Sequence, residues 1–509
     1  MTEAHDRWVA RHGIALALVL SLGVLLRARE YLANRSLWLD ESSLALNIIE
    51  RSFRALVAPL DYGQAAPPGF LFGERLVVTL VGSSEYALRA LPLLAGIFAL
   101  FVFWRLARQL LSPAGTLLAV AMFAISDSLI YYAAEVKQYG LDVATTVFLW
   151  WLCTTLMSRL DNGDIAAWAL VTVVGAATIW ISHPAIFVVG GIAAQVLCQA
   201  ALRRRPRLLI AGACSSGVWL VSFVALYLIS LRFFSPTIAQ AWYGAAAGPA
   251  GAAGAVGFRY LAWLRDTVRF RHTIWTLAVL PLGPHLLQLV TLCAAVGVIA
   301  LLWRRRDRQW AWFAVAVALA CLASSLRKYP ITPRLWLFLT PAMMLLVAAG
   351  VDEMWRRTRP FRLVAQLLAC LLLFYPGVAA ARGAVRPPQK EEVRPLLEYV
   401  RDHYRPGDAL YVYRYAGPAA RYYAERGLGF AGDVVRELDA ADWRYHAERN
   451  LEGLRGRDRV WVLLSHVERD GDGDHEKLLI QMLDRLGVRV DSKRSPGASL
   501  HLYDLSRAP

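Results

Sequence analysis

Two adjacent carboxylates, Asp40 and Glu41, follow Trp38 in the stretch SLWLDESSLALNI, directly after an apolar run. Charged side chains beside a bilayer are costly unless they act on a substrate or lie in water. A carboxylate in this position could serve as a general base that takes the proton from an acceptor hydroxyl. The alternative is structural, because acids in a first helical turn favour the helix dipole and Ser36 or Asp40 could cap the helix. The two roles are compatible, and we expect both acids to face water.

A second polar group lies in YYAAEVKQYGLDV, between two apolar runs. It contains Glu135, Lys137, Tyr139 and Asp142. A lysine beside a carboxylate suits a site that handles phosphate. The alternative is an interfacial belt in which aromatic and basic side chains snorkel to headgroup depth. Snorkelling gives no advantage to the two acids, which favours the functional interpretation.

A third group, in SSLRKYPITPR, contains Arg327, Lys328 and Arg334. The topology derived below puts these cations on the outer side, against the usual distribution of positive charge. An anionic lipid headgroup requires such cations at membrane depth, and ordinary loop charge is the alternative. His183, alone in a short turn, could line a site or cap a helix.

Four further residues could line the same site. Gln64 opens the segment QAAPPGFLF, whose two prolines set a rigid, extended entry into a helix, and Tyr62 lies just before it. Trp242 and Tyr243 precede a Gly/Ala-rich stretch, YGAAAGPAGAAGAVG. We expect that stretch either to close over a bound substrate or to rest on lipid.

The composition places the chain in a membrane. Its 509 residues are 57% hydrophobic, whereas soluble proteins have roughly 45–50% apolar residues. The excess lies in nearly uncharged blocks of about 18–25 residues, which can cross ~30 Å of hydrocarbon as helices. The net charge of +16 does not indicate nucleic-acid binding, because the arginines gather in short clusters between these blocks. All six cysteines lie in apolar blocks, so no disulfide framework or CxxC metal site is predicted.

The arginine clusters also orient the chain. We predict eleven spans: 13–29, 86–107, 113–130, 138–157, 164–181, 184–202, 208–230, 284–303, 309–326, 334–351 and 362–380. With a cytoplasmic N-terminus, the clusters at 203–207, 304–308 and 356–362 all fall on the cytoplasmic side, as the positive-inside rule requires. A first outer loop (30–85), a second (231–283) and the C-terminal tail then lie outside.

The chain divides into a transmembrane domain, 1–385, and a soluble periplasmic domain, 386–509. In the second, the patterns predict helices in EEVRPLLEYVRDHY, GPAARYYAERG and DHEKLLIQMLDRLG, and strands in DALYVYRY, DRVWVLLSHV and ASLHLYDL. Helices that alternate with strands indicate a small α/β domain. The domain has no nucleotide fingerprint or triad spacing, so we expect an accessory role.

These features together resemble the GT-C superfamily of membrane glycosyltransferases. The resemblance rests on the N-in first span, an outer loop opening with WLDE, an APPGF segment, an ExKxY at the junction of the third and fourth spans, and an arginine near the tenth span. It covers about residues 10–380. It is closest to the bacterial branch that contains the aminoarabinose, protein O-mannosyl and rhizobial galacturonic-acid transferases.

The resemblance implies an α-helical polytopic enzyme of the bacterial inner membrane that inverts the anomeric carbon of the transferred sugar. The implied donor is a polyprenyl-phosphate sugar, used on the periplasmic face without a nucleotide. The implied acceptor is a cell-envelope glycolipid, polysaccharide or lipopolysaccharide. Asp40 takes the role of the base, with Glu41 beside it, and Glu135 positions substrate or a divalent cation.

This sequence departs from the aminoarabinose enzymes at one position. Those enzymes have a lysine directly before the paired prolines, where this chain has Ala66. The donor phosphate is then expected to be bound by Lys137, Arg334 and Lys328, with Arg327 adjacent. The departure argues against aminoarabinose as the sugar.

Two other classes of protein compete with this interpretation. A lipid or glycan transporter would place ionisable residues in mid-span and often shows internal repeats or broken helices. A membrane-anchored binding protein would leave the acids and cations of the outer loops unexplained. Sugar transfer from a polyprenyl donor in proteoliposomes separates all three classes.

Overall fold

A computed structural model describes residues 2–233, 310–326, 328–330, 332–356, 359–437, 443–470 and 473–506. The chain forms two compact units. The first comprises Met1–Ala33, Ser52–Gly82 and Tyr86–Pro387. The second comprises Asn34–Arg51, Ser83–Glu85 and Pro388–Pro509. The second unit therefore contains part of the first outer loop as well as the C-terminal tail.

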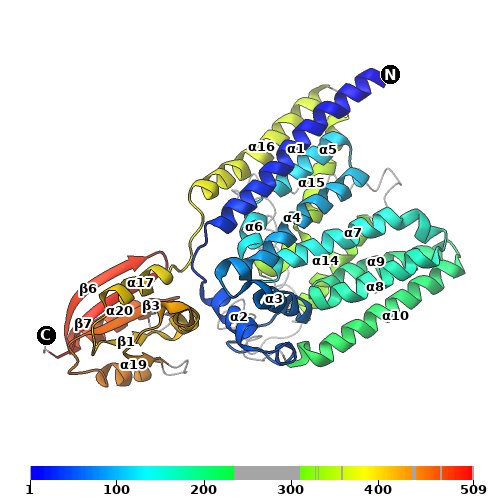
Figure 1. Cartoon of the computed structure of the whole chain (residues 1–509). Coiled ribbons are helices and arrows are strands. Elements are labelled where there is room, and N and C mark those ends of the chain that lie inside the picture. Colours follow the sequence, from blue (N-terminus) through cyan, green and yellow to red (C-terminus); the bar gives the residue numbers. More distant parts are fainter. Residues whose placement is uncertain are drawn as a thin grey trace, which may run out of the picture. The chain divides into compact units, whose positions relative to one another are not determined.

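The first unit is helical (Figure 1). Its helices are α1 (Thr2–Leu32), α3 (Pro68–Val81), α4 (Glu85–Leu110), α5 (Pro113–Ala124), α6 (Asp127–Tyr131), α7 (Tyr139–Asp161), α8 (Ile165–Ile181), α9 (Ala185–Leu202), α10 (Pro206–Ile229), α14 (Trp310–Ser325), α15 (Thr340–Trp355) and α16 (Arg359–Val385). Short 3-10 helices join them: η1 (Ala55–Val57), η2 (Tyr132–Ala134), η3 (Leu231–Phe233) and η4 (Pro333–Leu339).

Helices cover every predicted span except 284–303, which lies outside the described residues. In the described part of the chain, six helices are long and apolar enough to cross a membrane, or seven if the bent pair α5–α6 counts as one span. The chain is therefore a multi-pass membrane protein, and the total of eleven spans stays a prediction.

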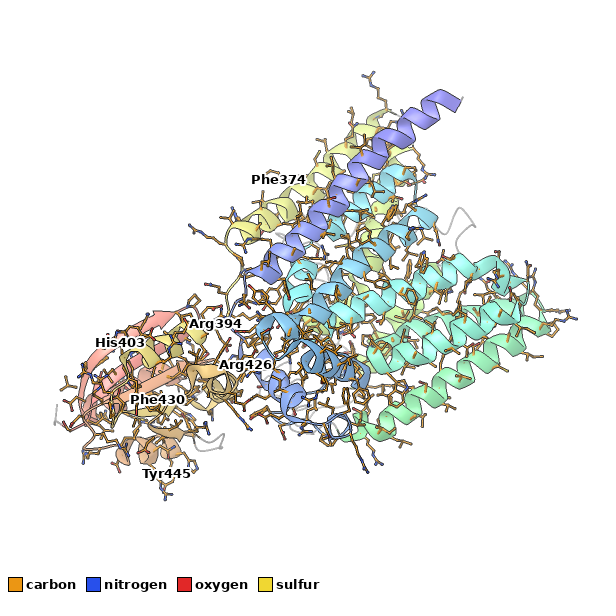
Figure 2. All side chains as sticks on the ribbon, viewed as in Figure 1. Phe374, Arg394, His403, Arg426, Phe430 and Tyr445 are labelled. Atoms are coloured by element: carbon orange, nitrogen blue, oxygen red, sulfur yellow. The ribbon has the colours of Figure 1, made fainter. Side chains whose placement is uncertain are left out.

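Burial distinguishes central from peripheral helices. The η4–α15 segment is 83% buried over its apolar window, whereas α10 is 17% buried. Helices α8, α9 and α10 lie side by side, and α14 packs against α9 (Figure 1). On α16, Phe374 projects away from the helix bundle (Figure 2) and is 70% exposed. Such exposed apolar faces are suited to lipid.

The bend between α5 and α6 leaves backbone carbonyls that a buried arginine satisfies. The two helices meet at 56°, and this break leaves carbonyl groups without helical partners. Arg27 of α1, which is fully buried, donates from Nη1 to the carbonyl of Ala124 and from Nη2 to that of Phe123, both at 3.2 Å. A buried guanidinium thus satisfies the broken backbone.

The second unit contains a mixed five-stranded sheet (Figure 1). Its strands are β1 (Ala409–Val412), β2 (Asp433–Arg436), β3 (Val460–Ser465), β6 (Val488–Ser495) and β7 (Ala498–Asp504), in the order β2-β1-β3-β7-β6. Strand β1 pairs in parallel with β2 and β3, and β7 pairs antiparallel with β3 and β6. A separate two-stranded ladder joins β4 (Arg469–Asp470) to β5 (Gly473–Asp474).

The helices of this unit are α2 (Leu39–Glu50), α17 (Arg394–His403), α18 (Gly417–Tyr423), α19 (Trp443–Glu452) and α20 (His475–Leu486), with short turns η5 (Arg414–Ala416) and η6 (Ala424–Leu428). Helix α18 packs against α2, α17 lies along β6, and α19 packs against α20. All three helices and all three strands predicted for the tail are present. The prediction missed β2, β6, α19 and the short strands β4 and β5.

Candidate active site

The acidic pair lies in the first turn of α2, as one of the two sequence interpretations predicts. The N-cap residue is Trp38, which is extended and whose own side chain makes no capping hydrogen bond, so the prediction that Ser36 or Asp40 is the cap is wrong. Asp40 is half-buried. Glu41 is fully buried, so the expectation that it faces water is also wrong.

Two glutamates of the tail take the place of a cap. Glu391 Oε2 accepts a hydrogen bond from the backbone N–H of Leu39 at 2.9 Å. Glu392 Oε2 accepts from the backbone N–H of Ser36 at 3.1 Å and from its hydroxyl at 2.8 Å. Both glutamates are buried, where a carboxylate is tolerated only with such donors. The segment before Asp40 is therefore fastened to residues 391–392.

The turn between β6 and β7 fixes the position of these two glutamates. The backbone N–H of Glu392 donates to the carbonyl of Pro496 at 2.8 Å, and Ser495 Oγ donates to the carbonyl of Glu392 at 2.6 Å. Gly497, at φ +65°, lies so close that an added Cβ would come within 1.8 Å of the Lys390 carbonyl oxygen. Only glycine fits this approach.

Arginines tie the three chain segments of the second unit together. Arg394, on α17 (Figure 2), pairs with Glu85 at 2.7 Å and donates to the carbonyl of Asn34 at 2.5 Å. Arg426 (Figure 2) donates to the carbonyl of Ser83 at 3.0 Å. The hydroxyl of Tyr423 accepts a hydrogen bond from the backbone N–H of Leu37 at 2.9 Å.

One histidine approaches the acidic pair from the end of β3. His466 Nδ1 lies 2.6 Å from Glu391 Oε1, and its ring is 6.4 Å from that of Trp38. The hydrogen bond to Glu391 is the largest cause that raises the pKa of His466 above its usual value. The charges of Glu391, Asp40 and Glu468 raise it further, against the opposing effect of burial.

In the first unit, Lys137 and Gln64 come together. Lys137 Nζ donates to Gln64 Oε1 at 2.6 Å. Lys137 and Glu135 are both buried. The segment that carries Gln64 turns through Tyr62 and Gly63, both with positive φ (58° and 62°), and Tyr62 itself is exposed. The two segments QAAPPGFLF and YYAAEVKQYGLDV are thus joined by a partly buried polar contact.

Arg334 joins the same group through Tyr139. Its guanidinium lies 6.0 Å from the centre of the Tyr139 ring, a cation–π distance. Tyr139 opens α7 and packs edge-on against Tyr132. The turn before Arg334 is fixed by Tyr329, whose hydroxyl donates to the carbonyl of Leu335 at 2.6 Å. Arg334, Tyr139, Lys137 and Gln64 thus belong to linked elements of one unit.

The remaining predicted site residues differ in burial and in charge. Asp142 is buried in the first turn of α7, and Lys328 is exposed. His183 lies in the turn between α8 and α9, and desolvation lowers its pKa to about 4, so that it is neutral at pH 7. Arg327, Trp242 and Tyr243 lie outside the described residues.

The described residues do not fit a divalent cation near Glu135. No three His, Cys, Asp or Glu side chains gather in the described part of the chain to form a metal site. The ammonium of Lys137, two residues after Glu135, donates to Gln64.

Sequence reasoning missed the residues that hold the acidic segment: Lys390, Glu391, Glu392, Tyr423, His466 and Gly497. They belong to the tail, which carries no motif with a recognised spacing. A weak signal existed. Glu391 and Glu392 form a second acidic pair where the soluble composition begins, and His466 directly follows a fully buried strand.

Comparison with known proteins defines the class. The family model of dolichyl-phosphate-mannose-protein mannosyltransferases matches residues 65–233, well under half of the chain. No curated protein matches the sequence. The chain is similar to the solved structure of ArnT from Cupriavidus metallidurans in the apo state, with a TM-score of 0.51 and 14% identity over 98% of each chain.

Two further structures show the same likeness. ArnT from Cupriavidus metallidurans bound to undecaprenyl phosphate has a TM-score of 0.51 and 13% identity, over 97% of this chain and 98% of that one. The Archaeoglobus fulgidus oligosaccharyltransferase AglB, in complex with an inhibitory peptide and a dolichol-phosphate, has a TM-score of 0.55 and 12% identity. That match covers 98% of this chain and 75% of AglB.

The chain therefore has the fold of a multi-pass membrane glycosyltransferase. More particularly, the fold is the one found in ArnT and AglB, which are GT-C membrane glycosyltransferases, and the resemblance predicted from the sequence is confirmed at the level of the fold.

Proposed function

We propose that this chain is an inverting glycosyltransferase that moves a pentose or hexose from a polyprenyl-phosphate donor to a hydroxyl of a cell-envelope acceptor. The acceptor is a glycolipid, a polysaccharide or lipopolysaccharide, and the reaction takes place on the periplasmic face of the bacterial inner membrane. The fold supports this, because two structures of the same fold hold undecaprenyl phosphate or dolichol-phosphate. The mannosyltransferase match over residues 65–233 supports it independently.

The observation that carries the proposal is the way Asp40 is held. It is a half-buried carboxylate at a helix N-terminus, on a segment fastened by two buried glutamates. Such fixed placement is what a general base needs, since proton transfer depends on geometry first. The acceptor hydroxyl gives its proton to Asp40 and its oxygen bonds to the anomeric carbon. The bond from that carbon to the phosphate oxygen breaks, and polyprenyl phosphate leaves.

Lys137 and Arg334 are the cations we assign to the donor phosphate. Lys137 donates a hydrogen bond to the side-chain amide of Gln64, and the guanidinium of Arg334 lies over the Tyr139 ring. An arginine–phosphate contact is bidentate and directional, whereas a lysine acts as a point charge. Glu135, adjacent in the chain, is assigned to substrate positioning.

The test is the Asp40→Asn substitution, assayed in proteoliposomes with a panel of radiolabelled polyprenyl-phosphate pentoses and hexoses and envelope lipids as acceptors. The amide has the size of the acid but cannot accept a proton, so turnover should fall by about 10²–10⁴-fold. Asp61→Asn, which changes an exposed acid of the same outer loop, is the matched control. Normal turnover in Asp40→Asn, or an equal loss in Asp61→Asn, would refute the assignment.

A lipid or glycan transporter is the second candidate, and the bent α5–α6 pair favours it, because transporters often contain broken spans. Arg27 counts against it, since it already satisfies the backbone exposed at the break. Two results together would favour the transporter. The Asp40→Asn variant would move a fluorescent polyprenyl-phosphate lipid between leaflets, and the wild type would transfer no sugar.

A further inference from the structure

His466 has an uncommon backbone conformation. Its φ is +51°, in the left-handed region that a non-glycine residue seldom adopts. Such a conformation persists only when the surroundings determine it, and it is concentrated at functional sites. Here Glu391 holds the imidazole through Nδ1, and the ring of Tyr415 packs edge-on at 5.8 Å. The backbone conformation and these two contacts therefore fix the orientation of the imidazole.

One carboxylate connects this imidazole to the acidic segment. The two oxygens of Glu391 have different partners: Oε1 lies 2.6 Å from His466 Nδ1, and Oε2 accepts from the backbone N–H of Leu39 at 2.9 Å. The next residue after Leu39 is Asp40. A continuous chain of hydrogen bonds and covalent bonds thus leads from His466 to the candidate base.

The charges around the imidazole favour its protonated form. Asp40, Glu391 and Glu468 contribute negative charge. Two cations offset them in part: Lys390, whose Nζ lies 3.6 Å from the centre of the Trp38 ring, and Arg414, which pairs with Glu468. Tyr415 donates from its hydroxyl to Glu468 at 3.1 Å.

We propose that His466 is a positioning residue for Asp40. As an imidazolium it anchors Glu391, whose second oxygen fixes the first turn of α2, and its positive charge favours the ionised form of the Asp40 carboxylate. This inference rests on the proposed role of Asp40 as general base. It gives the C-terminal domain a part in the reaction, because the positioning pair, Glu391 and His466, lies entirely in that domain.

The first experiment compares His466→Gln with His403→Gln in the full-length protein. His403 is an exposed histidine on α17 (Figure 2), and its ring Nδ1 lies 2.9 Å from the carbonyl oxygen of Tyr399 in the same helix. With the donor panel described above, we expect His466→Gln to lower kcat about tenfold at neutral pH, as the loss of one charge-assisted bond would. The KM for the donor should not change, and His403→Gln should match the wild type.

The pH profile separates positioning from a merely structural role. In the wild type, kcat should fall as the pH rises and the imidazolium loses its proton, and this alkaline limb should be absent in His466→Gln. A wild-type kcat and pH profile in His466→Gln, beside an inactive Asp40→Asn, would overturn the inference alone. An active Asp40→Asn would instead overturn the proposed function.

A second measurement needs no variant and no substrate. Hydrogen–deuterium exchange of the peptide that covers residues 36–42 in the wild type, corrected for intrinsic rates, should increase with pH once His466 is deprotonated, because Glu391 then holds Leu39 less firmly. Helix α19, on which Tyr445 is exposed (Figure 2), provides the internal reference. Exchange of residues 36–42 that follows α19 at every pH would contradict the inference.

Discussion

Asp40 and Glu41 show that residue type alone does not determine whether a carboxylate is accessible. Asp40 and Glu41 are adjacent, equally charged and in the same helical turn, yet Asp40 is half-buried and Glu41 is fully buried. The sequence predicted the pair and its place in a first turn. It could not predict which acid is accessible, because that depends on contacts made by residues several hundred positions away.

The donor cations should differ in strength. Arg334→Ala should raise the KM for the polyprenyl donor more than Lys137→Ala, since a bidentate guanidinium contact is stronger than a lone ammonium. Arg105→Ala is the control, because Arg105 also lies over an aromatic ring, Trp104, at 5.1 Å but is near the predicted cytoplasmic end of the span 86–107. Steady-state kinetics in proteoliposomes measure the effect. An unchanged donor KM with weaker acceptor binding would reassign both cations.

The stability of the second unit should depend on pH through His466. Its pKa is raised by the hydrogen bond to Glu391, whereas an unfolded histidine has a pKa of about 6.5. The pairing therefore stabilises the fold fully below pH ~6.5, and this contribution is lost as the pH rises through the folded pKa. Unfolding temperatures measured across this range should converge for the wild type and His466→Gln at alkaline pH. A difference that persists unchanged there would indicate a role without titration.

The hairpin turn at residues 495–497 is the element that supports Glu391 and Glu392. Gly497→Ala should displace residues 390–392, because its Cβ would meet the Lys390 carbonyl oxygen at 1.8 Å and its φ is +65°. Gly456→Ala is a matched control, since Gly456 has φ +86° and open space around its Cβ. Hydrogen exchange of residues 36–42 and sugar transfer should be affected only in the first variant. Equal effects would show that backbone strain alone matters.

Among the helices and strands, the sequence patterns correctly predicted those that are apolar along their whole length. The apolar blocks and the fully buried strands β1 and β3 are readable, because their own composition determines their environment. Strands β2 and β6 are exposed at most positions and rich in charge, as edge strands often are, so they resemble loops in sequence. The attachment of residues 34–51 to the tail has no sequence signature, since nonlocal hydrogen bonds leave no periodicity.

The whole molecule is predicted to have a cytoplasmic N-terminus and a periplasmic tail. Reporter fusions after Arg207, Arg306 and Arg359 should report the cytoplasm, and a fusion after Arg386 should report the periplasm. A phosphatase that is active only in the periplasm, paired with a fluorescent protein that folds only in the cytoplasm, reads both sides. A cytoplasmic tail would contradict the proposed function as a whole, because the second unit contains both the tail and Asp40.

The discontinuity of the second unit has a consequence for biosynthesis. Ser36 and its partner Glu392 are separated by 356 positions, which a ribosome translates in about 20–70 s at ~5–20 residues per second. The candidate catalytic segment thus leaves the ribosome long before the residues that fasten it exist. A premature stop codon after the last predicted span (362–380) and before Lys390 would yield a chain that still contains all the predicted spans, yet whose acidic pair has lost the carboxylates that fix it. Truncation of the tail is therefore expected to act on the first loop.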